Sequence, residues 1–267
     1  MLPHRRNPPI PRPDEMASVD LNSDLGEAFG VWSLGDDQTM LSVVTSANIA
    51  CGFHGGDPPT LRRVCGWAAD ARVRIGAQVS FPDLQGFGRR HMVIDPGELQ
   101  DLVLYQLGAL DAFAQVAGTE IAYVKPHGAL YHAAVNDAAV AGAVVAATAE
   151  YDPSCAILGP PQSALLTAAD AAGLEAVPEG FVDRAYLPDG TLVPRGQEGA
   201  VLSDVARIAE RAVKMVTDHA VEAVDGSSVA LSVRSLCVHG DTPGAVAMAR
   251  AVRSALMAAG IGIHPFT

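Results

Sequence analysis

Three short apolar runs in this chain of 267 residues end in the dipeptide His-Gly, at His54, His127 and His239. A fourth apolar run, near the N-terminus, ends in the acids Asp24 and Glu27. Imidazoles and carboxylates can move protons or bind a metal ion, so hydrolytic sites are often built from them. Buried parallel strands are apolar runs whose C-terminal ends carry the chemistry. The pattern therefore predicts that these five residues meet at one mouth.

Other charged residues stand at similar places in the chain. Lys125 ends an apolar run, and because a buried ammonium is costly without a counter-charge, we expect an acidic partner or an anionic ligand. Asp183 and Arg184 could supply a carboxylate and a forked anion binder, with a surface salt bridge as the alternative. For Asp24 and Glu27 the structural alternative is the capping of a helix.

The loop around His54 is unusually rich in glycine. Gly52, Gly55 and Gly56 lie within five residues, and their backbone entropy is lost on folding. Such a loop typically brings the backbone close to another group, which favours a functional His54. Two imidazoles and one acid suit Zn²⁺ or a similar divalent ion. The metal set predicted from these residue types is Asp24, His54 and His127.

Several known signatures are missing from the sequence. It contains no HExxH, no GxSxG and no GxGxxG after an apolar run. It also lacks GxxxxGK[ST], so the chain offers no Walker-type cradle for ATP. Its formal net charge of −12 argues against a general nucleic-acid binder, which needs a basic face.

The composition predicts a globular protein. Hydrophobic residues make up 49% of the chain, but no apolar stretch reaches the roughly 18 residues needed to span a membrane. The four cysteines form no CxxC pair, which is typical of reduced, buried thiols in a cytoplasmic protein. Residues 1–18 hold five prolines and three arginines, so we expect a disordered extension before a single domain at 19–267. Met16 is a candidate translation start.

Strand-like and helix-like segments alternate, which predicts a mainly parallel sheet. The expected strands are Val19–Ser23, Ala47–Cys51, Ile75–Val79, Ile121–Lys125, Cys155–Leu158, Glu175–Pro178 and Leu236–His239. The expected helices are Pro58–Arg72, Glu98–Val116, Asp137–Ala147, Gln162–Ala172, Asp204–Ala220 and Gly244–Ala259. A closed barrel of seven or eight strands competes with an open doubly wound sheet. Polar residues follow nearly every strand, which favours the barrel. Tyr186–Arg195 is expected to form a hairpin or lid, and Ala223–Ser232 a hairpin.

Six stretches carry a resemblance to a known family, in chain order: Asp20–Glu27, Ser46–His54, Gly86–Arg90, Val124–Tyr131, Asp183–Tyr186 and Cys237–Asp241. They resemble the LamB/YcsF family, the A subunit of bacterial ATP-dependent 5-oxoprolinase. The resemblance implies an α/β fold, a seven-stranded (β/α) barrel of the glycoside hydrolase/deacetylase type. It also implies a hydrolase that, with separate subunits B and C, converts 5-oxoproline, water and ATP into L-glutamate, ADP and phosphate. Two positions depart from the family: Gln78 replaces a frequent His, and Ser23 replaces a frequent Cys.

Roles for individual residues follow from this resemblance. The expected catalytic residues are Asp24, Glu27, His54, Lys125, His127 and His239. The first three would position or deprotonate water, with a divalent metal ion as an option, and the others would stabilise negative charge. The expected substrate-binding residues are Asn22, Asn48, Arg89, Asp183, Arg184 and Asp241. Among these, Arg184 would bind the substrate carboxylate.

The handling of ATP is expected to fall to the partner subunits, because the sequence lacks a phosphate-binding loop. Two other functions remain open at this point. One is a metal-dependent deacetylase or amidohydrolase that acts alone. The other is a non-catalytic subunit that only holds the true enzymes together.

Overall fold

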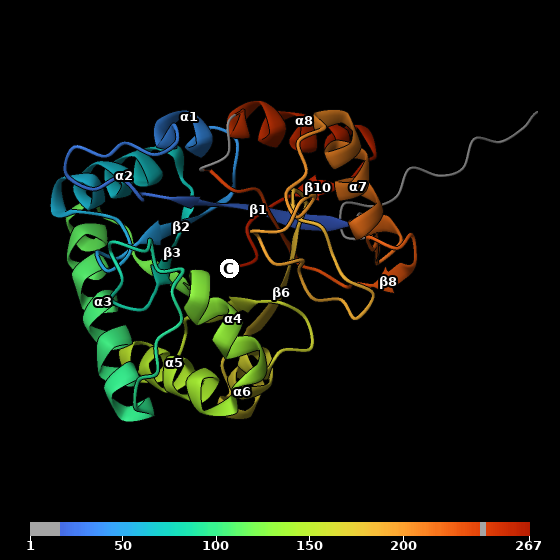
Figure 1. Cartoon of the computed structure of the whole chain (residues 1–267). Helices are drawn as coiled ribbons and strands as arrows, with labels where there is room; N and C mark the ends of the chain where they lie inside the picture. Colours follow the sequence, from blue (N-terminus) through green and yellow to red (C-terminus); the bar gives the residue numbers. More distant parts are fainter. Residues whose placement is uncertain (1–16, 241–243) are drawn as a thin grey trace, which may run out of the picture.

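Seven parallel strands close into a barrel in the computed structural model, which describes residues 17–240 and 244–267 (Figure 1). The strands, in their order around the barrel, are β1 (Ser18–Leu25), β2 (Ser46–Ala50), β3 (Arg74–Val79), β4 (Ile121–Pro126), β5 (Ala156–Gly159), β6 (Ala176–Phe181) and β9 (Ser235–Cys237). Parallel pairing of β9 with both β6 and β1 closes the ring. The predicted barrel is thus confirmed, and the open doubly wound sheet is wrong.

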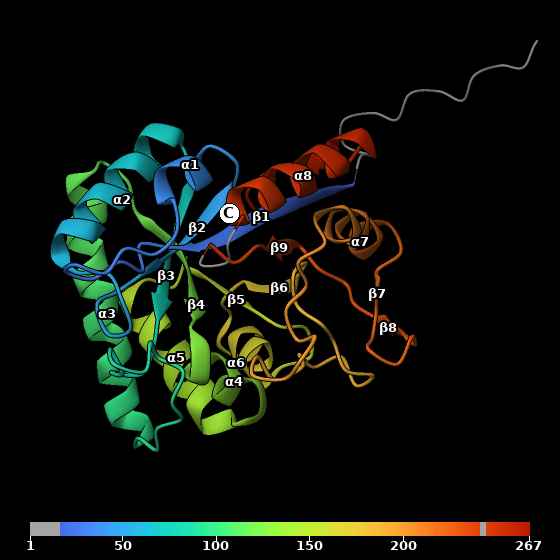
Figure 2. The same ribbon diagram turned by 45° about the horizontal axis from the view of Figure 1, so that its top comes forward.

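Helices surround the strands on the outside of the barrel (Figure 2). They are α1 (Asp37–Leu41), α2 (Pro58–Ala71), α3 (Pro96–Val116), α4 (Gly128–Asn136), α5 (Ala138–Tyr151), α6 (Ala164–Ala172), α7 (Val205–Thr217) and α8 (Ala245–Ala258). All six expected helices are present, whereas α1 and α4 had no prediction. Local chemistry sets their ends: the Asp57 carboxylate accepts from Thr60 N at the start of α2, and Gly173, with φ of 76°, ends α6.

Three short strands complete the fold. β7 (Ala220–Glu222) and β8 (Ser228–Ala230) form an antiparallel hairpin around the predicted Asp-Gly turn. β10 (Gly262–Ile263) extends the sheet beside the start of β1, where Ser18 pairs with Gly262. The predicted boundary of the extension at residue 18 therefore falls one residue inside β1, and residues 1–16 lie outside the described part of the chain.

The apolar core lies between the barrel wall and the helices. Fully buried side chains such as Leu21, Ile49 and Ile75 point outward from the strands toward this layer and belong to one continuous hydrophobic cluster with Leu107 and Val144 of the helices. Because side chains alternate along a strand, the neighbouring residues of each strand point into the barrel. This alternation leaves the interior free for polar groups.

The barrel interior is built from hydrogen-bonded polar side chains. At the end away from the mouth, the Asp20 carboxylate accepts hydrogen bonds from Thr45, Ser46 and Ser235. Burial raises the pKa of Asp20 to about 6, despite these hydrogen bonds. Ser46 belongs to β2, Thr45 immediately precedes it, and Ser235 belongs to β9. The network therefore links β1 to the strands on both of its sides. A buried polar network of this kind favours one strand register over others.

A second layer of the interior lies nearer the mouth. The Tyr123 hydroxyl donates to Asn48 Oδ1 at 2.7 Å, and Asn48 Nδ2 donates to Asn22 Oδ1 at 2.8 Å. The Tyr123 ring fills the space beside Gly76, where a Cβ atom would collide with it. Phe266, near the C-terminus, packs edge-on against the same ring. These residues lie beneath the candidate site and support it.

Among the described residues, no single helix is long and apolar enough to cross a membrane. The pair α4 and α5 reaches that length only together, and it is bent by 114° at the junction.

Candidate active site

A cavity of about 280 Å³ opens at the C-terminal ends of the strands. Five of the six predicted catalytic residues line it, namely Asp24, Glu27, Lys125, His127 and His239. The sixth, His54, lies directly behind His127, with its ring stacked at 3.9 Å between centroids and 9° between planes. Residues from opposite ends of the chain therefore converge on one mouth, because parallel strands all end there.

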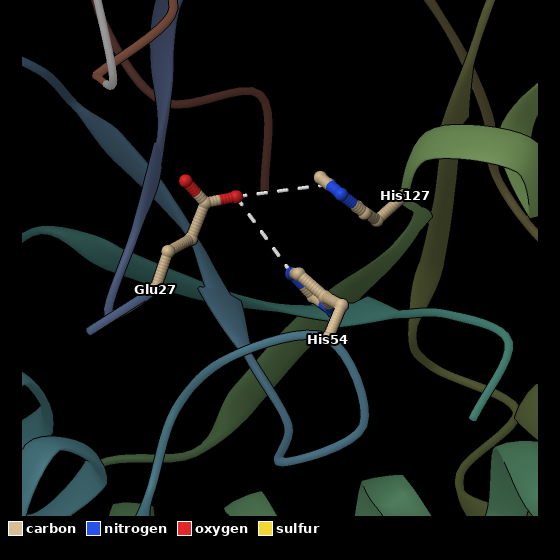
Figure 3. A group of neighbouring side chains, drawn as sticks. All are labelled: Glu27, His54 and His127. Carbon is tan, nitrogen blue, oxygen red and sulfur yellow. Dashed lines mark ion pairs between the residues drawn. The ribbon is translucent and has the colours of Figure 1, made fainter. Parts of the chain in front are cut away.

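The Glu27 carboxylate faces the stacked imidazoles of His54 and His127 from one side (Figure 3). One carboxylate oxygen, Oε1, is 3.7 Å from His54 Nε2 and 3.7 Å from His127 Nδ1. The three residues each offer a ligand atom within 4.8 Å of the other two, and all three are buried. This geometry and this donor set fit a divalent ion such as Zn²⁺.

Both imidazoles are held in a neutral form. Burial lowers the pKa of His54 to about 4, and burial together with the neighbouring His54 keeps the pKa of His127 well below its usual value. Nε2 of His127 lies 2.9 Å from the Phe87 carbonyl oxygen, and since it must donate there, its Nδ1 lone pair faces Glu27. Nε2 of His54 is 3.1 Å from Gln78 Oε1. His54 Nδ1 is buried without a hydrogen-bond partner among the described residues.

Two expectations for the acids need correction. The cluster that could hold a metal contains Glu27 in place of the predicted Asp24, because Asp24 is engaged elsewhere, by Asn48 at 2.8 Å and Lys125 at 3.4 Å. Helix capping, the structural alternative for the two acids, is also wrong. The next helix, α1, begins at residue 37 and is capped by Asp36.

Lys125 is a buried cation held by two carboxylates. Its Nζ lies 2.9 Å from Glu179 Oε2 and 3.4 Å from Asp24 Oδ1, and it also donates to Asn22 Oδ1 at 3.3 Å. Burial disfavours the ammonium, but Asp24, Cys237 and Glu179 together raise the pKa of Lys125 well above its usual value. Burial likewise opposes ionisation of Asp24, yet Lys125 holds the pKa of that carboxyl well below its usual range. The acidic partner expected for Lys125 is therefore present.

His239 forms a buried pair with Asp183. Its Nδ1 lies 2.9 Å from both carboxylate oxygens, and its ring stacks on Phe181 at 5.3 Å. Burial by itself would lower the pKa of His239, but the Asp183 carboxylate outweighs it and raises the pKa above the usual value. The surface salt bridge considered for Asp183 and Arg184 is thus wrong, since Asp183 pairs with His239 and both residues are buried.

The glycines of the His-Gly dipeptides act in two different ways. Only Gly128 uses a left-handed backbone, with φ of 55°. Gly55 and Gly240 are needed for close approach instead. A Cβ at Gly55 would lie 2.6 Å from the backbone oxygen of Glu27, and one at Gly240 would lie 2.5 Å from that of Asp24. Both glycines thus let the segments that carry His54 and His239 pack closely against the backbone of Glu27 and Asp24.

The predicted substrate-binding residues occupy different places. Arg89 lines the cavity from an exposed position, with its guanidinium 4.8 Å from the Phe87 ring centroid. Asn22 and Asn48 are fully buried beneath the cavity and support Asp24 and Lys125 rather than line the space. Asp241 lies outside the described residues.

Arg184 lines the cavity, but its guanidinium donates to backbone carbonyls. Nη2 donates to Val193 O at 2.6 Å and Nε donates to Ala200 O at 3.2 Å. Asp183 does not line the cavity and reaches it only through His239. Asp183 therefore holds the His239 ring in place, and Arg184 holds the backbone at Val193 and Ala200.

Sequence reasoning missed Glu179, the closer of the two carboxylates around Lys125. The predicted strand ended at Pro178, so Glu179 fell in an expected loop, whereas β6 continues to Phe181. One signal could have identified Glu179. It is an acid two residues after the inward-pointing Val177, so the alternation of side chains along a strand would place it inside the barrel as well. Arg195 and Tyr131, which also line the cavity, had no predicted role.

Known proteins resemble this chain over nearly its whole length. The family model of the LamB/YcsF family matches residues 19–267. The A subunit of 5-oxoprolinase from Mycolicibacterium gilvum is 56% identical over 252 residues, which cover 94% of this chain and all of that protein. The corresponding A subunit from Nocardia farcinica is 55% identical, and the match covers 93% of this chain and 99% of that protein.

Solved structures agree with this relationship. The lactam utilization protein from Thermus thermophilus has a TM-score of 0.89 and 43% identity, and the match covers 93% of this chain and all of that one. A putative cellobiose-phosphate cleavage protein from Enterococcus faecalis has a TM-score of 0.53 and 12% identity over 93% of this chain and 97% of its own, and it shares the fold alone. From these matches and the motifs gathered around the cavity, we conclude that the chain belongs to the LamB/YcsF family.

Proposed function

We propose that this protein is the A subunit of an ATP-dependent 5-oxoprolinase and that its cavity opens the lactam ring. The proposal is supported by relatives named as the A subunit of 5-oxoprolinase and by the relative named a lactam utilization protein. The observation that carries it is the cluster of Glu27, His54 and His127, which lies at one cavity with the buried ammonium of Lys125. Such a set can activate water beside a group that stabilises negative charge.

Hydrolysis of the lactam must be coupled to hydrolysis of ATP, because an unstrained lactam is a poor electrophile. In our scheme a partner subunit transfers the γ-phosphoryl group of ATP to the lactam oxygen. Water then adds to the ring carbon, the C–N bond breaks and a proton goes to the nitrogen. A second water hydrolyses the resulting acyl phosphate to L-glutamate and phosphate.

The residues divide this work between two sides of the cavity. Glu27 accepts a proton from the attacking water, and the neutral imidazole of His127 orients it. Lys125 stabilises the charge that develops on oxygen. His239, whose pKa the Asp183 carboxylate raises against the opposing effect of burial, donates a proton to the leaving nitrogen.

A divalent metal ion fits the cluster, and Glu27, His54 and His127 would hold it. When bound, it would act as a Lewis acid and lower the pKa of water. The same cluster supports a second candidate function, a metal-dependent amidohydrolase that needs no ATP. An assay with the metal but without ATP or partner subunits separates the two, because only the amidohydrolase would then turn over.

ATP binding and the remaining steps fall to subunits B and C in this proposal. Since the chain lacks a phosphate-binding loop, the nucleotide would be handled on the partner proteins. We place the reaction in the cytoplasm, where ATP is available and where the four free, buried cysteines stay reduced.

Reconstitution tests the proposal. The purified chain is mixed with subunits B and C, 5-oxoproline and ATP, glutamate is measured, and each component is omitted in turn. We expect glutamate only in the complete mixture, and we expect His127→Ala to abolish it while the exposed control His264→Ala leaves it unchanged. Full turnover by His127→Ala would remove that residue from the mechanism. If variants of the other cavity residues also formed glutamate at the normal rate, the chain would have only a scaffolding role in the complex.

A further inference from the structure

The segment that follows β1, residues 28–35, carries an exposed apolar surface. Its side chains Val31, Trp32 and Leu34 are 96%, 59% and 37% exposed. Nine large hydrophobic side chains are exposed in the described part of the chain, and the other six each stand more than ten residues from the next. The segment contains no charged residue, although the whole chain carries a formal net charge of −12. Exposed apolar side chains that cluster in this way mark a binding surface.

We propose that Val31, Trp32 and Leu34 form the docking surface for the partner subunit that supplies the phosphoryl group. The inference rests on the proposed function and names the face through which its subunits meet. The occupant is an apolar hollow on that subunit, beside its bound nucleotide, and the Trp32 indole inserts into it. Tryptophan is among the residues that contribute most to the binding energy at the centre of an interface, where charged residues are depleted.

Hydrogen bonds hold this surface in a fixed shape. Phe29 N donates to Trp32 O at 3.1 Å, and Trp32 N donates to Phe29 O at 2.9 Å, so the chain makes a tight turn between them. Gly30, with φ of 59°, supplies the left-handed backbone that such a turn requires. Gly30 N also donates to Asp57 Oδ2 at 2.8 Å. The turn is therefore formed before binding and presents Val31 at its tip, which reduces the entropy lost on association.

The segment borders catalytic residues at both of its ends. At one end, Glu27 and His54 line a hollow of about 470 Å³ together with the exposed side chains of the segment. Glu27 lines the catalytic cavity as well, so the hollow and the cavity share that residue. At the other end, a Cβ on Gly35 would lie 2.9 Å from the backbone oxygen of Gly240, the residue after His239. A protein seated on this segment therefore lies at the catalytic mouth.

The chemistry of the scheme favours a nucleotide-bearing partner over a second copy of this chain. The transferred phosphoryl group must come within about 3–3.5 Å of the lactam oxygen, so the protein that carries ATP has to reach this mouth. A phosphorylated lactam also reacts with water, which favours a mouth closed by an apolar contact. A second copy would cover the mouth with a chain that has no Walker-type cradle for ATP.

Binding to the purified partner subunits tests this surface. Subunits B and C are titrated calorimetrically into the wild-type chain, Val31→Gln and Trp32→Gln, with 5-oxoproline and a non-hydrolysable ATP analogue present. We expect Kd to rise at least about 10-fold for Trp32→Gln and about 3- to 10-fold for Val31→Gln. All variants should unfold at nearly the wild-type temperature, because the replaced side chains are exposed.

Val116→Gln is the matched control for these variants. Val116 is 70% exposed and ends α3, just ahead of the start of β4, so it lies at the end of the barrel away from the mouth. The same substitution of an exposed valine should leave the affinity for the partner subunits unchanged there. A loss of affinity equal to that of Val31→Gln would show a general effect of the substitution and overturn the assignment.

A kinetic assay separates docking from catalysis. Glutamate formation is measured while the concentration of subunits B and C is raised over a fixed concentration of the chain. For Trp32→Gln we expect the half-saturating concentration of the partners to rise at least about 10-fold, while the rate at saturation stays within about threefold of the wild type. A lower rate at saturation with an unchanged half-saturating concentration would overturn the docking role.

The remaining outcomes distinguish the inference from the function on which it rests. Equal affinity of the wild type and Trp32→Gln overturns the docking surface and leaves the proposed function intact. A smaller oligomer of Trp32→Gln in sedimentation of the chain alone, with partner binding unchanged, assigns the surface to a second copy and overturns it too. Failure of the wild type to bind the partner subunits overturns it as well. If the wild type binds them through Trp32 but no glutamate forms, the inference stands and the proposed function fails.

Discussion

Nζ of Lys125 on β4 lies 2.9 Å from Oε2 of Glu179 on β6, and this ion pair spans the inside of the barrel near its mouth. Both side chains are buried, with 3% and 0% of their surface exposed. Asp24 approaches the same ammonium from β1, at 3.4 Å. One cation thus faces two carboxylates, and removal of Lys125 leaves two neighbouring acids without a counter-charge.

The first prediction concerns the stability of this arrangement. Lys125→Met should lower the free energy of unfolding by about 3–5 kcal/mol, because two carboxylates then repel each other without a counter-charge. Combining it with Glu179→Gln should cost less than the sum of the two single changes, since the second change removes part of that repulsion. Urea unfolding of the wild type, both single variants and the double variant measures the coupling. Simple additivity would show that the pair does not interact.

The pair of His239 and Asp183 predicts a dependence of stability on pH. Asp183 has a pKa lowered below its usual 3.8, so its contribution is complete above pH 3.8 and is lost as the pH falls through the lowered value. His239 has a pKa raised above its usual 6.5, so its contribution is complete below pH 6.5 and is lost as the pH rises through the raised value. The pair should stabilise the fold most between these limits.

Asp183→Asn tests this pH window. At pH 5 we expect it to lower the free energy of unfolding by about 1.5–3 kcal/mol, as for loss of a hydrogen bond between charged groups. At pH 9 the deficit should be smaller. NMR titration of His239 should also show a lower imidazole pKa in the variant. A deficit that is the same at both pH values would mean that His239 is not protonated by this pairing.

Close backbone packing at Gly55 gives a third prediction. Gly55→Ala should destabilise the fold and disturb the site, because its Cβ would lie 2.6 Å from the Glu27 backbone oxygen. Gly66→Ala is the matched control: this glycine lies within α2 with open space around it, so alanine should stabilise the protein by about 0.4–1 kcal/mol. Thermal unfolding of both variants measures the contrast. Equal behaviour of the two would contradict the close approach.

Metal binding is the subject of the fourth prediction. Zn²⁺ titrated into the purified chain should bind at one site, and Glu27→Gln should weaken that binding by at least about 10-fold. Glu98→Gln, in the first turn of α3, should leave the affinity unchanged. Calorimetry at neutral pH suits the test, because both imidazoles are neutral there. Equal zinc affinity in the wild type and Glu27→Gln would exclude the cluster as the metal site.

The fold was largely accessible from the sequence because its strands are short apolar runs separated by helical periodicity. All seven barrel strands coincide with predicted runs, although β6 extends three residues further than expected. The short helix α1 was missed since five residues carry little periodic signal. Helix α4 begins immediately after His127, in a stretch that sequence reasoning treated as a catalytic motif.

The sequence by itself determined which residue types stand at the ends of the strands, and therefore that acids, imidazoles and a lysine would gather at one mouth. Only the tertiary structure decided the partners. It placed Glu27 rather than Asp24 beside the two stacked imidazoles, and it paired Lys125 with Glu179 and Asp24. The physical reason is that position along a strand fixes the end and face at which a side chain lies, whereas barrel closure and the loop paths fix which neighbour it meets.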